Sequence, residues 1–216
     1  MKNLIFVCAI STVFSTSCFC QLVGVRPNVG GNFANMASQN ATGETNTGLN
    51  GGIGFDIALA ESENGYPIRL SPEIFVRQNG SENFVNQSNI FNGFQSLDLT
   101  YVGIYMPLTF ALGPDDGETV FEGVMIQLNT FLDYAVATDA IASNGQQVTN
   151  PVSGFTEKID FGFGVNIQFH SGYGGIAIGY NWGLNNIDFI NNVSSQIFAK
   201  NKGLFVNAVT TFKTDN

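Results

Sequence analysis

Few side chains in this 216-residue chain could carry acid–base or nucleophilic chemistry. His170 is the only histidine, and it opens the segment His170-Ser171-Gly172-Tyr173-Gly174. This composition predicts a short turn, so we interpret His170 as a solvated turn residue rather than a catalytic base. No Ser-His-Asp or Cys-His pair is suggested elsewhere, and no H-E-x-x-H or Walker motif occurs. We therefore predict a protein that is not an enzyme, with no catalytic residue and no cofactor.

Metal chemistry has one weak candidate, the acidic segment Asp115-Asp116-Gly117-Glu118. It lacks the alternating oxygen ligands of a recognised calcium loop, and a solvated tight turn explains it better. The three cysteines, Cys8, Cys18 and Cys20, all lie in the first twenty residues. The rest of the chain can form neither a disulfide nor a thiolate metal site. We predict no metal site.

The remaining charges follow a pattern along the chain. Because strand side chains alternate between two faces, four cations and five anions in the polar phases of predicted strands would face one interior. In a dry core they would be costly unless paired. In a narrow membrane barrel they can pair with each other, and we predict a structural salt-bridge network that plugs the lumen, with an ion path as the alternative. The network comprises Arg26, Asp56, Arg69, Glu73, Arg77, Asp98, Asp133, Lys158 and Asp160.

The elements that would position these charges are clearest between Lys158 and Asn186. Here two alternating apolar and polar stretches flank the His170 turn. Each strand has one apolar face and one face of small, amide and charged groups. A soluble sandwich would bury the apolar face in a core, whereas a membrane barrel would turn it toward lipid.

Eight strands of this kind are predicted, without an amphipathic helix. In the fourth strand the apolar phase changes from Leu97, Leu99 and Tyr101 to Ile104 and Met106, which predicts a β-bulge near Gly103. The predicted ranges are 22–33, 51–60, 68–78, 97–112, 121–136, 158–169, 176–184 and 203–213.

The connections alternate in length along the chain. Short turns are predicted at 61–67, 113–119 and 170–174, and long polar loops at 36–50, 79–96, 137–156 and 187–202. This order is typical of a barrel with turns at one end and loops at the other. The fold class predicted is therefore all-β, an eight-stranded antiparallel up-and-down transmembrane β-barrel.

Aromatic residues are expected to form two belts at the membrane interfaces, although strands are aromatic-rich in general. One set lies near the short turns and the other toward the long loops. The first set is Phe110, Phe121, Phe169, Tyr173 and Phe212, and the second is Tyr101, Tyr134, Tyr180 and Trp182.

The N-terminus predicts export. A basic start, an apolar run and the small residues of Cys18-Phe19-Cys20 predict a cleaved signal peptide at 1–20, followed by a barrel domain at 21–216. Acylation of Cys18 or Cys20 is the alternative. After cleavage, seven basic and 17 acidic residues remain, a formal charge of −10, which disfavours nucleic acid as a partner. No later apolar run is long enough for a membrane-spanning helix.

At the level of motifs, the chain resembles the PorT-like outer-membrane β-barrel family of Gram-negative bacteria. The resemblance covers essentially the whole mature chain and implies an eight-stranded outer-membrane barrel without a common assigned activity. The C-terminus departs from the usual pattern of such barrels, because four residues follow Phe212. The motifs are Val23-Gly24-Val25-Arg26, Asn32-Phe33-Ala34, Leu70-Ser71-Pro72-Glu73, Tyr105-Met106-Pro107-Leu108, Asp160-Phe161-Gly162-Phe163-Gly164 and Tyr180-Asn181-Trp182-Gly183-Leu184.

Three functions remain open at this stage. The first is a non-enzymatic outer-membrane barrel, structural, adhesive or accessory to a secretion or envelope machine, with membrane lipid and an envelope or secretion protein as partners. The second is a soluble periplasmic or secreted lipocalin-like barrel that binds an apolar ligand, which requires an apolar interior and charges outside. The third, an outer-membrane hydrolase, would need a catalytic set at the long-loop end, where no histidine is found.

Overall fold

The computed structural model describes residues 21–37, 41–61, 67–86, 94–112, 123–152, 154–172, 174–190 and 196–213. In these ranges every regular element is a β-strand, and no helix is long and apolar enough to cross a membrane. The strands are β1 (Gln21–Ala37), β2 (Ala41–Glu61), β3 (Pro67–Leu70), β4 (Glu73–Asn86), β5 (Phe94–Ala111), β6 (Gly123–Ala142), β7 (Gln147–Thr149), β8 (Ile159–Ser171), β9 (Gly174–Gly183), β10 (Ile187–Ile190), β11 (Gln196–Thr210) and β12 (Phe212–Lys213). The predicted signal peptide and the Asp115–Glu118 segment lie outside the described residues.

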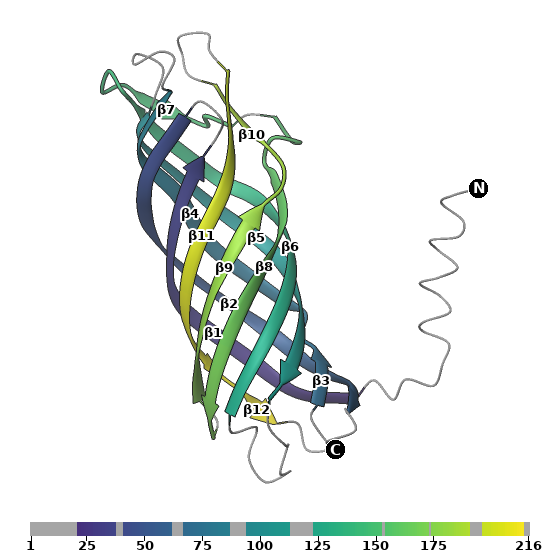
Figure 1. Ribbon diagram of the computed structural model, residues 1–216. Coiled ribbons are helices and arrows are strands. Elements are labelled where there is room, and N and C mark those ends of the chain that lie inside the picture. The colour runs from purple at the N-terminus through teal and green to yellow at the C-terminus, as the bar shows by residue number, and fades with distance from the viewer. Residues whose placement is uncertain are drawn as a thin grey trace, which may run out of the picture.

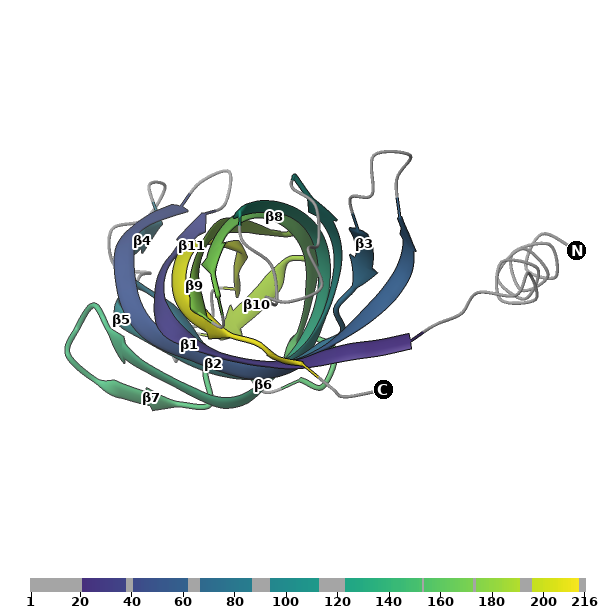
Figure 2. The same cartoon turned by 90° about the horizontal axis from the view of Figure 1, so that it is seen from below.

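The strands close into one antiparallel ring (Figures 1 and 2). Successive wall strands pair in chain order, and β11 pairs back onto β1. β3 and β4 form one wall strand interrupted at Ser71-Pro72, because both pair with β2 and with β5. β12 continues β11 along β1, and β7 and β10 are additions on β6 and β11. The predicted eight-stranded antiparallel up-and-down barrel is confirmed.

The register determines how strongly the strands tilt. Starting at Tyr134 on β6 and moving sideways from partner to partner, the path returns to β6 at Val124, ten residues earlier. Eight strands with this stagger tilt by about 40° for spacings of about 3.3 Å along a strand and about 4.8 Å between strands. This tilt is typical of membrane barrels. The path runs through Val102, Val76, Gly51, Val29, Ala208, Ile176 and Phe169.

The polarity of the wall is the reverse of that in a soluble protein. Large apolar side chains point outward on every wall strand, with Val29 64% and Ile74 62% exposed. Polar and charged side chains point inward, and Arg77 is 4% and Asp133 1% exposed. A fold that exposes apolar side chains around its whole circumference requires an apolar solvent, which is the arrangement of a transmembrane barrel.

Most of the residues predicted to form long loops are instead strands. β1 continues to Ala37 and β2 begins at Ala41, and β4 reaches Asn86. β6 reaches Ala142 and is followed by β7 in the same predicted loop, and β10 occupies part of the last one. With 21 residues in β2 and 20 in β6, these strands are about twice as long as the 9–11 residues that cross a bilayer. We call the outer extension the strand segments 41–48, 78–86, 94–101, 135–142 and 196–200, with β7 and β10. It lies opposite the end that carries β3 and β12 (Figure 1).

In the outer extension the residue types on the two faces of a strand are exchanged, although the alternation of inward and outward side chains stays in phase. On β5, odd-numbered residues point inward from Leu97 to Ala111, so the bulge predicted near Gly103 is wrong. Leu97, Leu99 and Tyr101 lie inside the barrel, and Asp98 lies outside. The apolar phase changed sides because water replaces lipid outside this part of the barrel. The actual bulge lies on β6, where Val136 and Ala137 are both exposed and the pairing with β5 shifts.

Candidate functional site: the lumen and its plug

The lumen is filled by side chains from all sides of the ring rather than left as an open channel. Inward-facing glycines make room for large side chains on neighbouring strands. Gly162 and Gly179 lie opposite Phe131 and Phe205, and a Cβ on either glycine would come within 2.8 Å of the opposing ring. Small and large residues therefore alternate across the lumen, as required in a narrow barrel.

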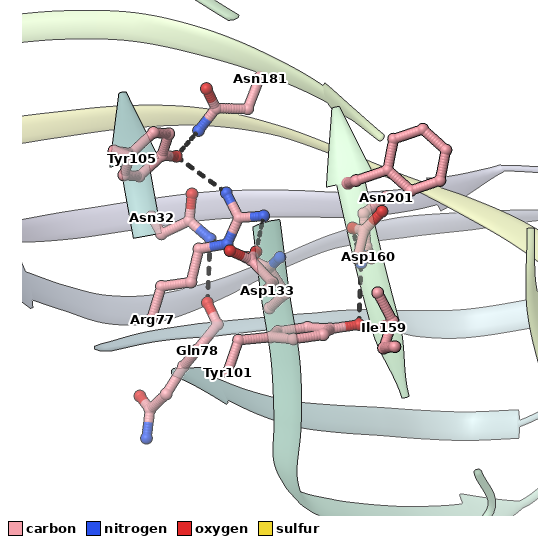
Figure 3. Close-up of polar contacts among 12 residues, drawn as sticks. Asn32, Arg77, Gln78, Tyr101, Tyr105, Asp133, Ile159, Asp160, Asn181 and Asn201 are labelled. Atoms are coloured by element: carbon pink, nitrogen blue, oxygen red, sulfur yellow. Dashed lines mark hydrogen bonds and ion pairs between the residues drawn. The ribbon is translucent and has the colours of Figure 1, made fainter. Parts of the chain in front are cut away.

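The centre of the plug is the ion pair between Arg77 of β4 and Asp133 of β6 (Figure 3). Arg77 Nη1 also donates to the Tyr105 hydroxyl at 3.0 Å, and Asn181 donates to the same hydroxyl. Four wall strands, β4, β5, β6 and β9, are thereby connected across the lumen. A buried pair of this kind contributes connectivity more than net stability, because its desolvation cost offsets the attraction.

Aromatic rings surround the Arg77 guanidinium. Its central carbon lies 4.6 Å from the Phe131 ring centroid and 5.5 Å from that of Phe75, within cation–π range. The Phe75 and Tyr105 rings contact each other with centroids 4.2 Å apart. These rings exclude water from the ion pair and close the cross-section at this level.

A second polar group lies next to the ion pair, toward the outer extension. Asn201 of β11 donates to Asp160 Oδ2 at 2.8 Å and to the Tyr101 hydroxyl at 2.9 Å (Figure 3). Asp160 is the cross-strand partner of Asp133. Two carboxylates of neighbouring strands thus meet beside a single Arg77 cation, with Asn201 satisfying one oxygen of Asp160.

Nearer the β3 and β12 end, the lumen is polar and less tightly filled. Arg26 Nη1 lies 3.6 Å from Asp56 Oδ1, and Arg69 is buried. A cavity of about 50 Å³ extends from Arg26 to Arg77 and Tyr105 of the plug, and Asn, Gln and apolar side chains line it together with Glu73. This volume corresponds to one or a few water molecules.

His170 does not occupy the position predicted for it. It is the last inward-facing residue of β8, 6% exposed, beside Gly123 and Gly175. The prediction of a solvated turn residue is wrong because β8 extends through Ser171 before the chain turns.

Seven of the nine charged residues predicted for the lumen lie inside the barrel. They form two paired groups, around Arg26–Asp56 and around Arg77–Asp133, with Arg69, Glu73 and Asp160 nearby. The predicted lumen position of Asp98 is wrong, because its side chain points outward and accepts a 2.8 Å hydrogen bond from Asn46 Nδ2. The predicted lumen position of Lys158 is also wrong, because this residue belongs to the turn before β8 and is half-buried. Its backbone carbonyl accepts a hydrogen bond from Ala135 N at 2.8 Å.

The prediction missed the aromatic and amide half of the plug. Phe75 and Phe131 share the inward parity of Glu73 and Asp133, the charges already identified on their strands, which was the available signal. Tyr105 had no such signal, because Asp98, the charge predicted on its strand, has the opposite parity. Asn201 was hidden in a predicted loop. Tyr101 was expected in the outer aromatic belt but is fully buried in the lumen. The outer wall near Trp182 does carry aromatic contacts, with Phe163 stacked on it at 5.3 Å and Tyr180 at 4.6 Å.

Beyond the plug, an apolar cluster closes the lumen within the outer extension. Phe94, Leu97 and Leu99 point inward there, and Val152 and Ile187 complete the cluster from the segments near β7 and β10. Its interior resembles the core of a soluble protein, and the outside carries Glu44, Glu82, Asp98 and Asp139. The lumen is therefore occupied at two successive levels, one polar and one apolar.

The fold and this filled lumen define a transmembrane β-barrel without a continuous channel through the described residues. Among those residues, no group of three or more His, Cys, Asp or Glu side chains is arranged to hold a metal ion. No family model matches the chain, and no curated protein matches it.

The solved structures that match this chain include the following three. Ail, the attachment invasion locus protein of Yersinia pestis, in complex with the heparin analogue sucrose octasulfate, is 11% identical, with 89% of this chain and 100% of that chain covered and a TM-score of 0.48. Neisserial surface protein A is also 11% identical, with 87% and 97% covered and a TM-score of 0.49. Ail of Yersinia pestis in a phospholipid bilayer nanodisc is 12% identical, with 88% and 99% covered and a TM-score of 0.37. Folds are shared by proteins of unrelated function, and the fold assignment rests on the strand pairing above.

Proposed function

We propose that the chain is an integral outer-membrane barrel, non-enzymatic and closed to ions, which acts through its outer extension as an adhesive or accessory binding protein of the envelope. The observation that carries this proposal is the polarity change along β5. Outward residues are apolar from Val102 to Phe110 and polar at Asp98 and Thr100. A strand of unbroken parity that changes its outer face in this way passes from lipid into water.

The filled lumen supports a binding role rather than a pore. Conduction would require a path past the Arg77–Asp133 pair and then past the apolar cluster at Leu97 and Leu99. The lipocalin-like alternative requires an apolar interior with charges outside. This alternative would place Arg69, Glu73 and Asp160 on the outer wall. Instead, Arg69 and Asp160 are buried inside the barrel and Glu73 lines the internal cavity.

Export through a cleaved signal peptide at 1–20, and membership of the PorT-like group, are parts of this proposal. Two of the motifs that carry the resemblance contact each other, because Ser71 N donates to Pro107 O at 2.9 Å. This contact joins the β3–β4 interruption to the proline of β5. It supports a shared structural role for the two motifs.

Fractionation combined with gel mobility tests the membrane placement. The full-length protein, expressed with its leader in a Gram-negative host, should sediment with outer membranes. Unheated samples should migrate differently from boiled samples in detergent gels, because the closed barrel survives the detergent until heating. Recovery in the soluble periplasmic fraction, without a heat-dependent shift, would refute the proposal.

A further inference from the structure

The charged side chains inside the barrel have an excess of one anion. The group near the β3 and β12 end is balanced, because it contains two arginines and two carboxylates. The excess therefore belongs to the plug, where Asp133 and Asp160 lie beside Arg77 (Figure 3). Within the described residues, the cations that point into the lumen are Arg26, Arg69 and Arg77, and the anions are Asp56, Glu73, Asp133 and Asp160.

The two carboxyl groups of the plug are forced together by the strand register. Asp133 of β6 and Asp160 of β8 are direct cross-strand partners, and both side chains point inward. Such partners have Cβ atoms about 4.5–5.5 Å apart. Asp133 is 1% and Asp160 0% exposed. Two ionised carboxylates at this spacing and burial repel each other, which favours a neutral form of one of them.

The neighbouring titratable groups do not remove the excess charge. Arg77 is the cation that attracts both carboxyl groups. The hydroxyls of Tyr101 and Tyr105 also face the plug, but they are neutral and contribute hydrogen bonds only. His170 lies ten residues farther along β8, beside the balanced group, and this separation is about 33 Å along a strand.

The packing around Asp160 is too tight for a compensating metal ion. A Cβ added to Gly183 would lie 2.9 Å from Asp160 Oδ1, so the Gly183 backbone lies close to this carboxyl group. The gap lined by Gly183, Arg77 and Asn201 has no volume for a water molecule. Among the described residues, Asp160 Oδ1 has no hydrogen-bond donor. A proton occupies no additional volume and supplies a donor between the two carboxyl groups.

We propose that the plug binds one proton, which Asp133 and Asp160 share at neutral pH, so that Arg77 and the two carboxyl groups together are neutral. The inference goes beyond the proposed function, because it concerns the interior of the barrel and does not require a partner on the outer extension. The folded chain holds a proton that the unfolded chain, with its aspartates in water, releases. The free energy of unfolding should therefore fall as the pH rises, until the folded chain also releases the proton.

Infrared spectroscopy of the purified full-length protein in lipid vesicles tests the site. At neutral pH exposed Asp and Glu side chains are ionised, so the C=O stretching band of a protonated carboxyl group should come from the plug. The unmodified protein should show this band, and the Asp160→Asn and Asp133→Asn proteins should each lose it. Asp98→Asn is the matched control, because it removes an exposed, outward-facing aspartate and should leave the band in place.

Urea unfolding provides a second measurement, which a role in packing alone would not change. Between neutral and mildly alkaline pH, the folded-to-unfolded equilibrium constant of the unmodified protein should fall by up to about tenfold per pH unit. Asp160→Asn should remove this dependence, and Asp98→Asn should retain it. The heat-dependent gel shift shows whether each variant still forms the closed barrel.

Absence of the band from the unmodified protein would overturn the proposal, as would an unchanged band in both the Asp133→Asn and Asp160→Asn proteins. Stability that follows the sodium concentration instead of the pH would assign the excess charge to a metal ion and would also refute the shared proton. The band and the pH dependence of the unmodified protein need no substitution, so they decide the question even where a variant does not fold. None of these outcomes affects the proposed function, which fractionation tests separately.

Discussion

At the scale of single residues, Arg77 connects more of the barrel than any other charge discussed above. It pairs with Asp133, donates to Tyr105, and lies against the rings of Phe75 and Phe131. Asp133 in turn is 1% exposed and lies opposite Asp160 across the strand pair. One guanidinium thus lies beside two carboxyl groups that the strand register brings together, and it forms an ion pair with Asp133.

Replacing Arg77 with Met should lower the free energy of unfolding by about 3–5 kcal/mol, because Asp133 would remain buried without its cation. The double variant Arg77→Met with Asp133→Leu should recover most of this loss. Urea unfolding in lipid vesicles, followed by the fluorescence of Trp182, the only tryptophan, provides the measurement. A single variant as stable as the unmodified protein would contradict the structural role of the pair.

Gly179 illustrates a second requirement at residue scale, the space beneath an inward aromatic ring. A Cβ on Gly179 would lie 2.5 Å from Phe205 Cζ and still closer to Asn166 Cβ. Gly179→Ala should therefore destabilise the barrel by about 1–3 kcal/mol, and adding Phe205→Leu should restore part of the loss. Gly174→Ala, where nothing lies within 4 Å of the added Cβ, should change stability by less than about 0.5 kcal/mol in the same urea titration. Equal effects of the two alanines would exclude this explanation.

At the scale of elements, β5 records the membrane boundary in its own sequence. Inward parity is continuous, whereas the chemical character of both faces reverses near Tyr101. Inside, the reversal separates the polar plug from the apolar cluster. Outside, it separates the lipid-facing wall from the charged surface at Asp98. The outer face of one strand thus contacts both lipid and water. Its length of 18 residues exceeds the 9–11 residues that a strand needs to cross the bilayer.

Cysteine labelling can locate this boundary, because residues 21–216 contain no cysteine. Asp98→Cys should react with a membrane-impermeant maleimide on intact cells, since the side chain points into water. Ile104→Cys, on the same outward face, should react only after detergent and boiling, because lipid covers it. Leu99→Cys, which points inward, controls for reaction through the lumen. Equal labelling at positions 98 and 104 would contradict the proposed boundary.

At the scale of the whole molecule, an eight-stranded ring with a ten-residue stagger leaves an interior that side chains fill. The side chains inside the lumen form layers along the barrel axis. The Arg26–Asp56 pair comes first, the Arg77–Asp133 pair follows, and the apolar cluster lies in the outer extension. The outer extension then continues the wall as β-sheet beyond the apolar belt, and in the proposed function this sheet carries the binding surface.

The purified barrel should produce no resolved current steps in a planar bilayer. Arg77→Ala combined with Tyr105→Ala should remain silent, because the apolar cluster still closes the lumen. Adding Leu97→Ala and Leu99→Ala should produce steps, since both layers would then be weakened. Current steps from the unmodified protein, or from the first double variant, would contradict the closure by two layers.

Much of the barrel was predictable because strand alternation is a local property. Lys158 to Asn186 indicated two strands with one apolar face each, and the structure contains both as β8 and β9. Seven of the nine lumen charges followed from the same parity. The predictions of an inward-facing Asp98 and of a bulge near Gly103 were wrong for one physical reason. The alternation of side chains shows which residues share a face of the strand, but not whether lipid or water touches that face.

The sequence by itself determined the all-β class, the number of wall strands and the residues that share a face, because hydrophobic alternation and turn chemistry act over a few neighbours. Only the tertiary structure decided that Arg77 selects Asp133, that His170 and Tyr101 point into the lumen, and that the polar loops are strands of an outer extension. Each of these depends on which strands lie side by side and on the stagger with which the ring closes. Ring closure joins residues that are far apart in the chain, such as Tyr101 and Asn201, so local patterns do not contain it.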